Sequence, residues 1–401
     1  MEKSKNRQGV TVLIAGAALQ LFLGILYVWS SFVGPVSKAL TSDLAWNAKI
    51  VEQNVKLTSS FMLCFFVIGI FFGGKLMAKI GSQKTVLIGG LMLAFGMLAT
   101  AFIPVQYPWL IYVTYGIIGG FGVGAGYNSI ISAAQKWFPK NRGFATGFSV
   151  CAFGFSTVIF APLIEWCIGQ MGLKNTLMLL AGIFLVMVLA LFSFIKTPKD
   201  AGPSNTVIHD ETKQFTMGQM LKRKEFYFIT LSMMFVTAPF FILMPSFKIF
   251  AAERGLTPNE ATIMIMITGV ANALGRLGAP LLSDKIGREK AILTIILATA
   301  VSCVCMAFIP GYAFIGFVAI AAFCYGGTSG VYPVITADYF GIKNVGSNYG
   351  AVMMGFALSA LTFPMVLGMV KDSTMLFIVL TAIALAAALC IVMLMMSKKK
   401  K

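Results

Sequence analysis

Apolar runs of about 20 residues or more recur along this chain, and each is long enough to cross a hydrocarbon core of about 30 Å. Runs of this length and number constrain the fold more than any other feature of the sequence. They predict an all-α, polytopic membrane protein with twelve transmembrane helices. The predicted helices lie near residues 10–38, 57–79, 84–104, 108–137, 142–169, 175–197, 225–253, 258–284, 288–309, 311–338, 346–371 and 374–396.

The composition supports a membrane protein and leaves no room for a large soluble domain. Of the 401 residues, 58% are hydrophobic and only 11% are charged, whereas soluble domains carry roughly a quarter charged residues. The basic N-terminus is followed by a long apolar run without a small-residue cleavage site. We therefore interpret this run as the first span and not as a removable signal peptide.

The net charge of +17 is distributed as in a membrane protein and not as in a nucleic-acid-binding protein. Most Lys and Arg residues lie in alternate connections and at the termini, the bias known as the positive-inside rule. It predicts a multi-pass protein of the cell membrane with both termini in the cytoplasm. The basic run Lys398–Lys401 is expected to lie near anionic lipid, and we expect no nucleic-acid partner.

Residues 197–224 form the only long polar gap and divide the chain into two six-span halves. The predicted domains are an N-terminal six-helix bundle (1–197), a cytoplasmic linker (198–224) and a C-terminal six-helix bundle (225–401). The turn Lys79-Ile-Gly81 in the first half matches Lys285-Ile-Gly287 in the second. Two similar bundles that rock about a midplane site are a common transporter plan.

Arg276 is the basic residue that departs from this charge pattern, because it lies inside the apolar run 258–284. It precedes Asp284 by eight residues, or about 12 Å along a helix, which places it near mid-membrane. An arginine stays charged in a protein, and such a residue marks a functional site by default. No carboxylate in the sequence is placed at its depth, so an anionic substrate is favoured, bound through two parallel hydrogen bonds. A structural arginine that caps helix carbonyls or pairs with Glu165 is the alternative.

Uncharged polar and aromatic residues lie in several of the predicted spans and are candidates to surround the anion. Asn272 lies four residues before Arg276, on the same helix face. The glycine-rich run 119–126 is predicted to pack closely against neighbouring helices. The remaining candidates from this pattern are Tyr27, Tyr127, Asn128, Tyr325, Tyr332 and Phe356.

The sequence lacks the residues that catalysis or metal binding would need. An enzyme requires a nucleophile with a base, or a metal cluster. The single histidine, His209, lies in the central loop, and the seven cysteines fall inside predicted spans, where they behave as small apolar residues. We therefore predict no enzyme, no catalytic residues, no metal and no cofactor. A channel is disfavoured because no ring of like charges or repeated filter sequence is present.

The chain resembles the major facilitator superfamily over essentially its whole length, and Ser283–Arg288 is close to the loop motif of that superfamily. More specifically, it is similar to the oxalate/formate antiporter family, relatives of the animal monocarboxylate transporters. Three stretches carry this resemblance: Tyr27-Val-Trp29, Trp137-Phe-Pro…Arg142-Gly, and Arg276 ahead of the loop motif. The resemblance implies that Arg276 binds the substrate carboxylate and that Tyr27, Tyr127 and Tyr325 line the site.

Departures from these relatives narrow the expected substrate. The oxalate carrier has a second cation, a lysine in the eleventh span, where this chain has Phe356. One cation suits a monocarboxylate better than a dianion, because a second buried charge would lack a partner. The aspartate and lysine of the animal monocarboxylate transporters correspond to Asn272 and Ser31, so the coupling ion stays open.

We therefore expect a monomeric secondary transporter of a small monocarboxylate such as lactate, pyruvate or formate, working by alternating access. A co-transported proton or an exchanged anion would drive it. The alternatives are oxalate-type dicarboxylate exchange, with Lys248 as a second cation, efflux of a larger organic compound, and a transporter-like sensor that binds an anion without moving it.

Overall fold

A computed structural model describes residues 2–41, 48–104, 106–198, 214–367, 370 and 372–399. Within these ranges the chain is helical and contains no strand, which confirms the all-α prediction. The helices are α1 (Glu2–Leu23), η1 (Gly24–Val28), α2 (Trp29–Thr41), α3 (Ala48–Ile80), α4 (Ser82–Thr100), η2 (Tyr112–Gly119), α5 (Gly120–Trp137), α6 (Arg142–Leu191), η3 (Phe192–Phe194), α7 (Met217–Met220), α8 (Lys224–Glu253), α9 (Pro258–Ile286), α10 (Arg288–Phe308), α11 (Tyr312–Phe340), α12 (Val345–Leu367) and α13 (Ser373–Lys399).

The described part of the chain contains 10 helical segments that are long and apolar enough to cross a membrane. One of them, Arg142–Phe194, is 53 residues long and covers two of the predicted spans, 142–169 and 175–197. It is interrupted at Gly172, whose φ of 77° lies in the left-handed region that favours glycine. Helix α12 coincides with the predicted span near 346–371 as far as Leu367. The chain is thus a multi-pass membrane protein.

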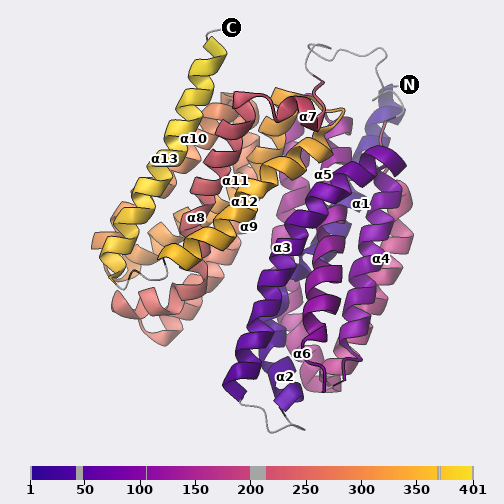
Figure 1. The fold of residues 1–401 in the computed structure, drawn as a ribbon, viewed down its shortest axis with the longest axis vertical. Helices are drawn as coiled ribbons and strands as arrows, with labels where there is room; N and C mark the ends of the chain where they lie inside the picture. The colour runs from indigo at the N-terminus through magenta and orange to yellow at the C-terminus, as the bar shows by residue number, and fades with distance from the viewer. Residues whose placement is uncertain are drawn as a thin grey trace. The chain divides into compact units, whose positions relative to one another are not determined.

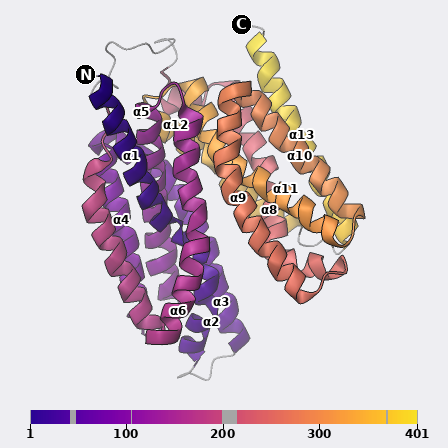
Figure 2. The ribbon, with the colours of Figure 1, turned by 180° about the vertical axis from the view of Figure 1, so that it is seen from behind.

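The helices form two compact units. Unit 1 comprises Met1–Trp137 and Phe155–Thr206, and unit 2 comprises Phe138–Gly154 and Val207–Lys401. The first part of α6 therefore groups with α8–α13, although in sequence it lies in the first half of the chain. Figures 1 and 2 show the helices of each unit from opposite sides. We call the end of each unit that adjoins the predicted linker the linker end, and the opposite one the far end.

In unit 1, glycines bring the backbones of α3, α4 and α5 into contact. A Cβ atom on Gly124 would lie 2.0 Å from the carbonyl oxygen of Phe66, and one on Gly122 would lie 2.4 Å from that of Gly89. Figure 1 shows these three helices running alongside one another. Close packing through small residues is how helices associate where lipid supplies no hydrophobic drive. The predicted role of the glycine-rich run is confirmed.

In unit 2, glycines likewise bring the backbone of α9 into contact with α11 and with the start of α6. A Cβ atom on Gly275 would lie 1.9 Å from the Phe323 carbonyl oxygen, and one on Gly326 would lie 2.0 Å from that of Asn272. On the α6 side, a Cβ atom on Gly143 would lie 2.3 Å from the carbonyl oxygen of Pro280. Helix α9, which carries Arg276, is therefore held at backbone contact on two sides.

We expect Gly275→Ala to destabilise the protein, because its new methyl group must displace the α11 backbone. Overpacking of this kind costs about 1–3 kcal/mol. Gly269→Ala on the same helix is the matched control, since nothing lies within 4 Å of its Cβ position. Thermal unfolding of the purified chain should show a lower midpoint for Gly275→Ala than for wild type. The midpoint of Gly269→Ala should be unchanged. Equal midpoints for the two variants would contradict the close contact of α9 with α11.

Candidate functional site

Arg276 is buried on α9, with 1% of its surface exposed. Its Nε donates a hydrogen bond to Oδ1 of Asn272, one turn earlier, at 3.1 Å. The predicted placement of these two side chains on one helix face is therefore correct. Because burial removes a guanidinium from water, its position must be supported by polar and aromatic neighbours.

The first part of α6 supplies two of those neighbours within unit 2. The Cζ atom of Arg276 lies 5.7 Å from the centre of the Phe153 ring, within the range of a cation–π interaction. A Cβ atom on the adjacent Gly154 would lie 2.8 Å from Cδ and 3.1 Å from Nε of Arg276. The missing side chain at Gly154 thus leaves the room in which the arginine side chain lies.

Both carboxylates of α9 form interactions at the ends of the helix. At its N-terminus, Glu260 caps the helix with Thr257 and accepts a hydrogen bond from Tyr312. At the linker end, Asp284 forms an ion pair with Arg288 at 2.6 Å. Neither residue is near the middle of α9, where Arg276 lies.

Asp284 also holds the start of α6 against α9. Its carboxylate accepts hydrogen bonds from the backbone N–H of Gly143 at 3.2 Å and of Phe144 at 3.0 Å. A carboxylate at a helix N-terminus is stabilised by the exposed N–H groups and the helix dipole. Asp338 on α11 joins the same cluster through Arg142 at 2.6 Å and Arg288 at 2.9 Å. These bonds hold Phe153 and Gly154 in register with Arg276.

An aromatic cluster from α8, α11 and α12 surrounds the predicted site residue Tyr325. Its ring stacks on Phe240, with centres 3.9 Å apart and an angle of 13° between the planes. Phe241 lies edge-on to Tyr325 at 5.9 Å and to the predicted site residue Phe356 at 4.9 Å. The next residue after Tyr325 is Gly326, which contacts Asn272. The structure therefore brings Arg276, Asn272, Tyr325 and Phe356 into one region of unit 2.

Tyr332 makes a contact that is separate from the aromatic cluster around Tyr325. Its side chain is fully buried between α11 and α8, where its hydroxyl shares a hydrogen bond of 2.6 Å with Ser232. A buried hydroxyl with a partner is typical of helix packing. Tyr332 remains a candidate from the sequence, but its observed contact joins two helices.

Two further candidates, Asn128 and Tyr127, contact helix α3 within unit 1. Asn128 donates from Nδ2 to the carbonyl oxygen of Ile70 at 2.8 Å, which ties α5 to α3. Tyr127 is buried, with its ring edge-on to Phe66 at 5.3 Å. Tyr27 lies in η1, but its side chain is outside the described residues, as is that of Lys248. Glu165 also belongs to unit 1, where it accepts a hydrogen bond from Ser31 at 3.4 Å.

Sequence reasoning missed four residues near the site: Phe153, Gly154, Phe240 and Phe241. The spacing Gly143-x-x-x-Gly147 is a known signal for close helix contact, and Gly154 lies two further turns along the same face. Even so, that spacing does not identify α9 as the partner helix. Phe240 and Phe241 follow Pro239, and nothing in their sequence distinguishes them from other apolar residues of the span.

Most of the chain matches a known protein family. The model of the Major Facilitator Superfamily matches residues 17–250 and 229–401. The chain is similar to the oxalate:formate antiporter of Oxalobacter formigenes, with 26% identity over 345 residues, 84% of this chain and 79% of that protein. It is also similar to monocarboxylate transporter 13 of Bos taurus, with 23% identity over 311 residues, 75% of this chain and 70% of that protein.

The fold agrees with a solved structure of the same superfamily. The proton:xylose symporter XylE, bound to 6-bromo-6-deoxy-D-glucose, superposes with a TM-score of 0.73 at 15% identity, covering 96% of this chain and 95% of that chain. At this identity the likeness establishes the fold alone. Together with the family match, it shows that the chain belongs to the Major Facilitator Superfamily and is a membrane transporter, not an enzyme.

Proposed function

We propose that this protein carries a small monocarboxylate, of the lactate, pyruvate or formate type, across the cell membrane by alternating access. The observation that carries the proposal is the buried guanidinium of Arg276, held by Asn272 beside an aromatic cluster. Of the two relatives described above, one is named as an oxalate:formate antiporter and the other as a monocarboxylate transporter.

The chemistry of the arginine favours a carboxylate as its ligand. The guanidinium is planar and permanently charged, and it matches the two oxygens of a carboxylate through parallel hydrogen bonds. Asn272 restrains the rotation of the side chain by accepting from Nε. The guanidinium carbon lies 5.7 Å from the centre of the Phe153 ring, so this ring adds a cation–π contact that helps to hold the charged group in place.

The surroundings favour one carboxylate over two. Tyr325, Phe240, Phe241 and Phe356 present rings and one hydroxyl, and none of them carries a positive charge. A dianion held by one arginine would keep an uncompensated charge among these rings, which is costly in a low-dielectric site. Oxalate-type exchange is therefore the second candidate, supported by the similarity to the oxalate:formate antiporter.

We expect Arg276→Ala to abolish high-affinity uptake of labelled lactate, pyruvate or formate into proteoliposomes. Removal of one partner of a buried charge pair typically costs 2–5 kcal/mol, or about 30-fold or more in affinity. Arg276→Lys should bind more weakly than wild type, because an ammonium keeps the charge but lacks the two-pronged geometry. Near wild-type affinity in Arg276→Ala would refute the site and leave efflux of a larger compound as the better hypothesis.

The same vesicles distinguish the remaining alternatives. Labelled oxalate in place of the monocarboxylate tests dicarboxylate exchange, and binding without counterflow would identify an anion sensor. An imposed pH gradient drives net uptake if a proton is co-transported. If only preloaded anion drives uptake, the protein is an exchanger.

We further expect Gly154→Ala to raise the KM for the carboxylate about tenfold while changing kcat less. The added methyl group would meet Cδ and Nε of Arg276 at 2.8 and 3.1 Å. Because these atoms belong to a flexible side chain, the arginine would move and the helix would not, so affinity should fall more than stability. Gly169→Ala on the same helix is the matched control, with nothing within 4 Å of its Cβ position. A Gly154→Ala variant with unchanged KM would exclude this positioning role.

A further inference from the structure

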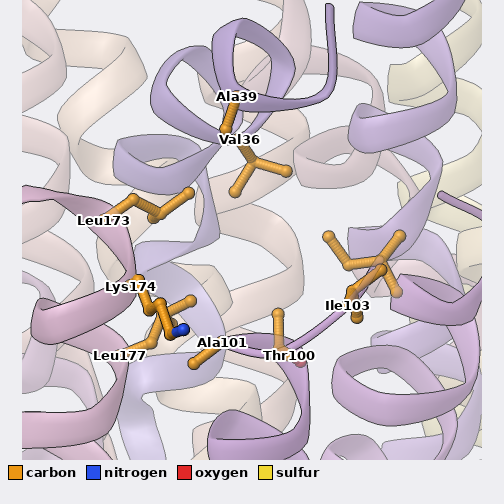
Figure 3. Close-up of a pocket in the computed structure, with 9 residues that line it drawn as sticks. Val36, Ala39, Thr100, Ala101, Ile103, Leu173, Lys174 and Leu177 are labelled. Atoms are coloured by element: carbon orange, nitrogen blue, oxygen red, sulfur yellow. The ribbon is translucent and has the colours of Figure 1, made fainter. Parts of the chain in front are cut away.

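The far end of unit 1 contains a cavity of about 160 Å³ that is separate from the residues around Arg276. It lies between α2, the end of α4 with the segment after it, and the part of α6 that follows the Gly172 turn. Figure 3 shows Val36 and Ala39 on one side of the space, with Thr100 and Ala101 opposite. The lining residues are Val36, Ala39, Thr100, Ala101, Ile103, Ile111, Leu173, Lys174 and Leu177.

The walls of this cavity are apolar. Seven of the lining residues named above are Val, Ala, Ile or Leu. Thr100 adds little polarity, because its hydroxyl donates to the Gly96 carbonyl oxygen at 2.7 Å and is bonded to the Thr114 hydroxyl at 2.9 Å. A dry, apolar cavity of about 150 Å³ is large enough to bind benzene. This cavity can therefore enclose a group of about that size.

Lys174 provides the charge at this cavity. Its Nζ lies 4.5 Å from the centre of the Phe102 ring, a cation–π contact that orients the ammonium without neutralising it. No residue in the described part of the chain forms an ion pair with it. The side chain is exposed, so an anionic group can reach it from solvent. A single cation at the edge of a benzene-sized apolar space is complementary to an amphipathic anion.

We propose that this cavity is a second ligand site, which binds a monocarboxylate with an aryl or branched alkyl body. The ring or branched chain would occupy the apolar space, and the carboxylate would pair with the Lys174 ammonium. In the orientation that the charge bias predicts, the site opens outside the cell. All of its residues belong to unit 1, whereas Arg276 belongs to unit 2. The proposal is therefore independent of the proposed function.

A titration of the purified, full-length Arg276→Ala variant with benzoate, followed by saturation-transfer difference NMR, tests this proposal. The Arg276→Ala variant is used so that the carboxylate site proposed above does not compete for benzoate. We expect saturable benzoate binding, and two- to fivefold weaker binding of benzamide, which has the same shape without the charge. Lys174→Gln should remove the preference for benzoate. Arg254→Gln, at a basic residue of unit 2, is the control and should leave it unchanged.

Filling the cavity should eliminate the binding of both benzoate and benzamide. Val36→Phe places a ring in the space, and Ala101→Leu is a milder second variant should the first fail to fold. Saturable benzoate binding that survives both substitutions would overturn the proposal, as would its absence from the Arg276→Ala variant. Loss of benzoate binding on addition of phosphatidylglycerol would instead assign the space to a lipid acyl chain and overturn it as well. None of these outcomes depends on whether Arg276 supports uptake.

Discussion

Backbone contact between α9 and its neighbours is the constraint on which the candidate site depends. In lipid, helices gain little from burying apolar side chains, so close approach and hydrogen bonding decide which helices associate. Gly275, Gly326 and Gly330 bring α9 and α11 together, and Gly143 and Gly147 do the same for the start of α6. Any side chain at these positions would separate the helices that surround Arg276.

That packing makes the burial of an arginine tolerable. A guanidinium removed from water needs hydrogen bonds and polarisable neighbours to offset the loss of hydration. Asn272 supplies a hydrogen-bond acceptor from the same helix, and Phe153 supplies an aromatic face from α6. Phe153 is available to Arg276 because Asp284 fixes the start of α6, and Gly154 leaves space for the arginine side chain.

The Trp137-Phe-Pro…Arg142-Gly segment, the most specific part of the family resemblance, has structural roles in both units. In unit 1, Trp137 donates from Nε1 to the Lys196 carbonyl oxygen at 2.6 Å, which anchors the chain where the predicted linker begins. In unit 2, Arg142 pairs with Asp338, and Gly143 allows contact with α9. At the other end of the linker, Asn348 donates to the Phe215 carbonyl oxygen at 3.0 Å. The contacts of the Trp137–Gly143 segment therefore hold helices together at the linker end of each unit.

The sequence alone determined the class of fold and the approximate spans, and it singled out Arg276 as the candidate binding residue, because hydropathy, span length and a charge in an apolar run are local properties. It also placed Asn272 beside Arg276, since residues four apart share a helix face. Only the tertiary structure grouped the first part of α6 with unit 2 and brought Phe153, Gly154 and the Phe240–Tyr325 stack to the site. It also bonded Tyr332 to Ser232 and Asn128 to the Ile70 carbonyl group. Which helices meet depends on backbone approach between distant segments, and apolar periodicity within one segment carries no information about its partner.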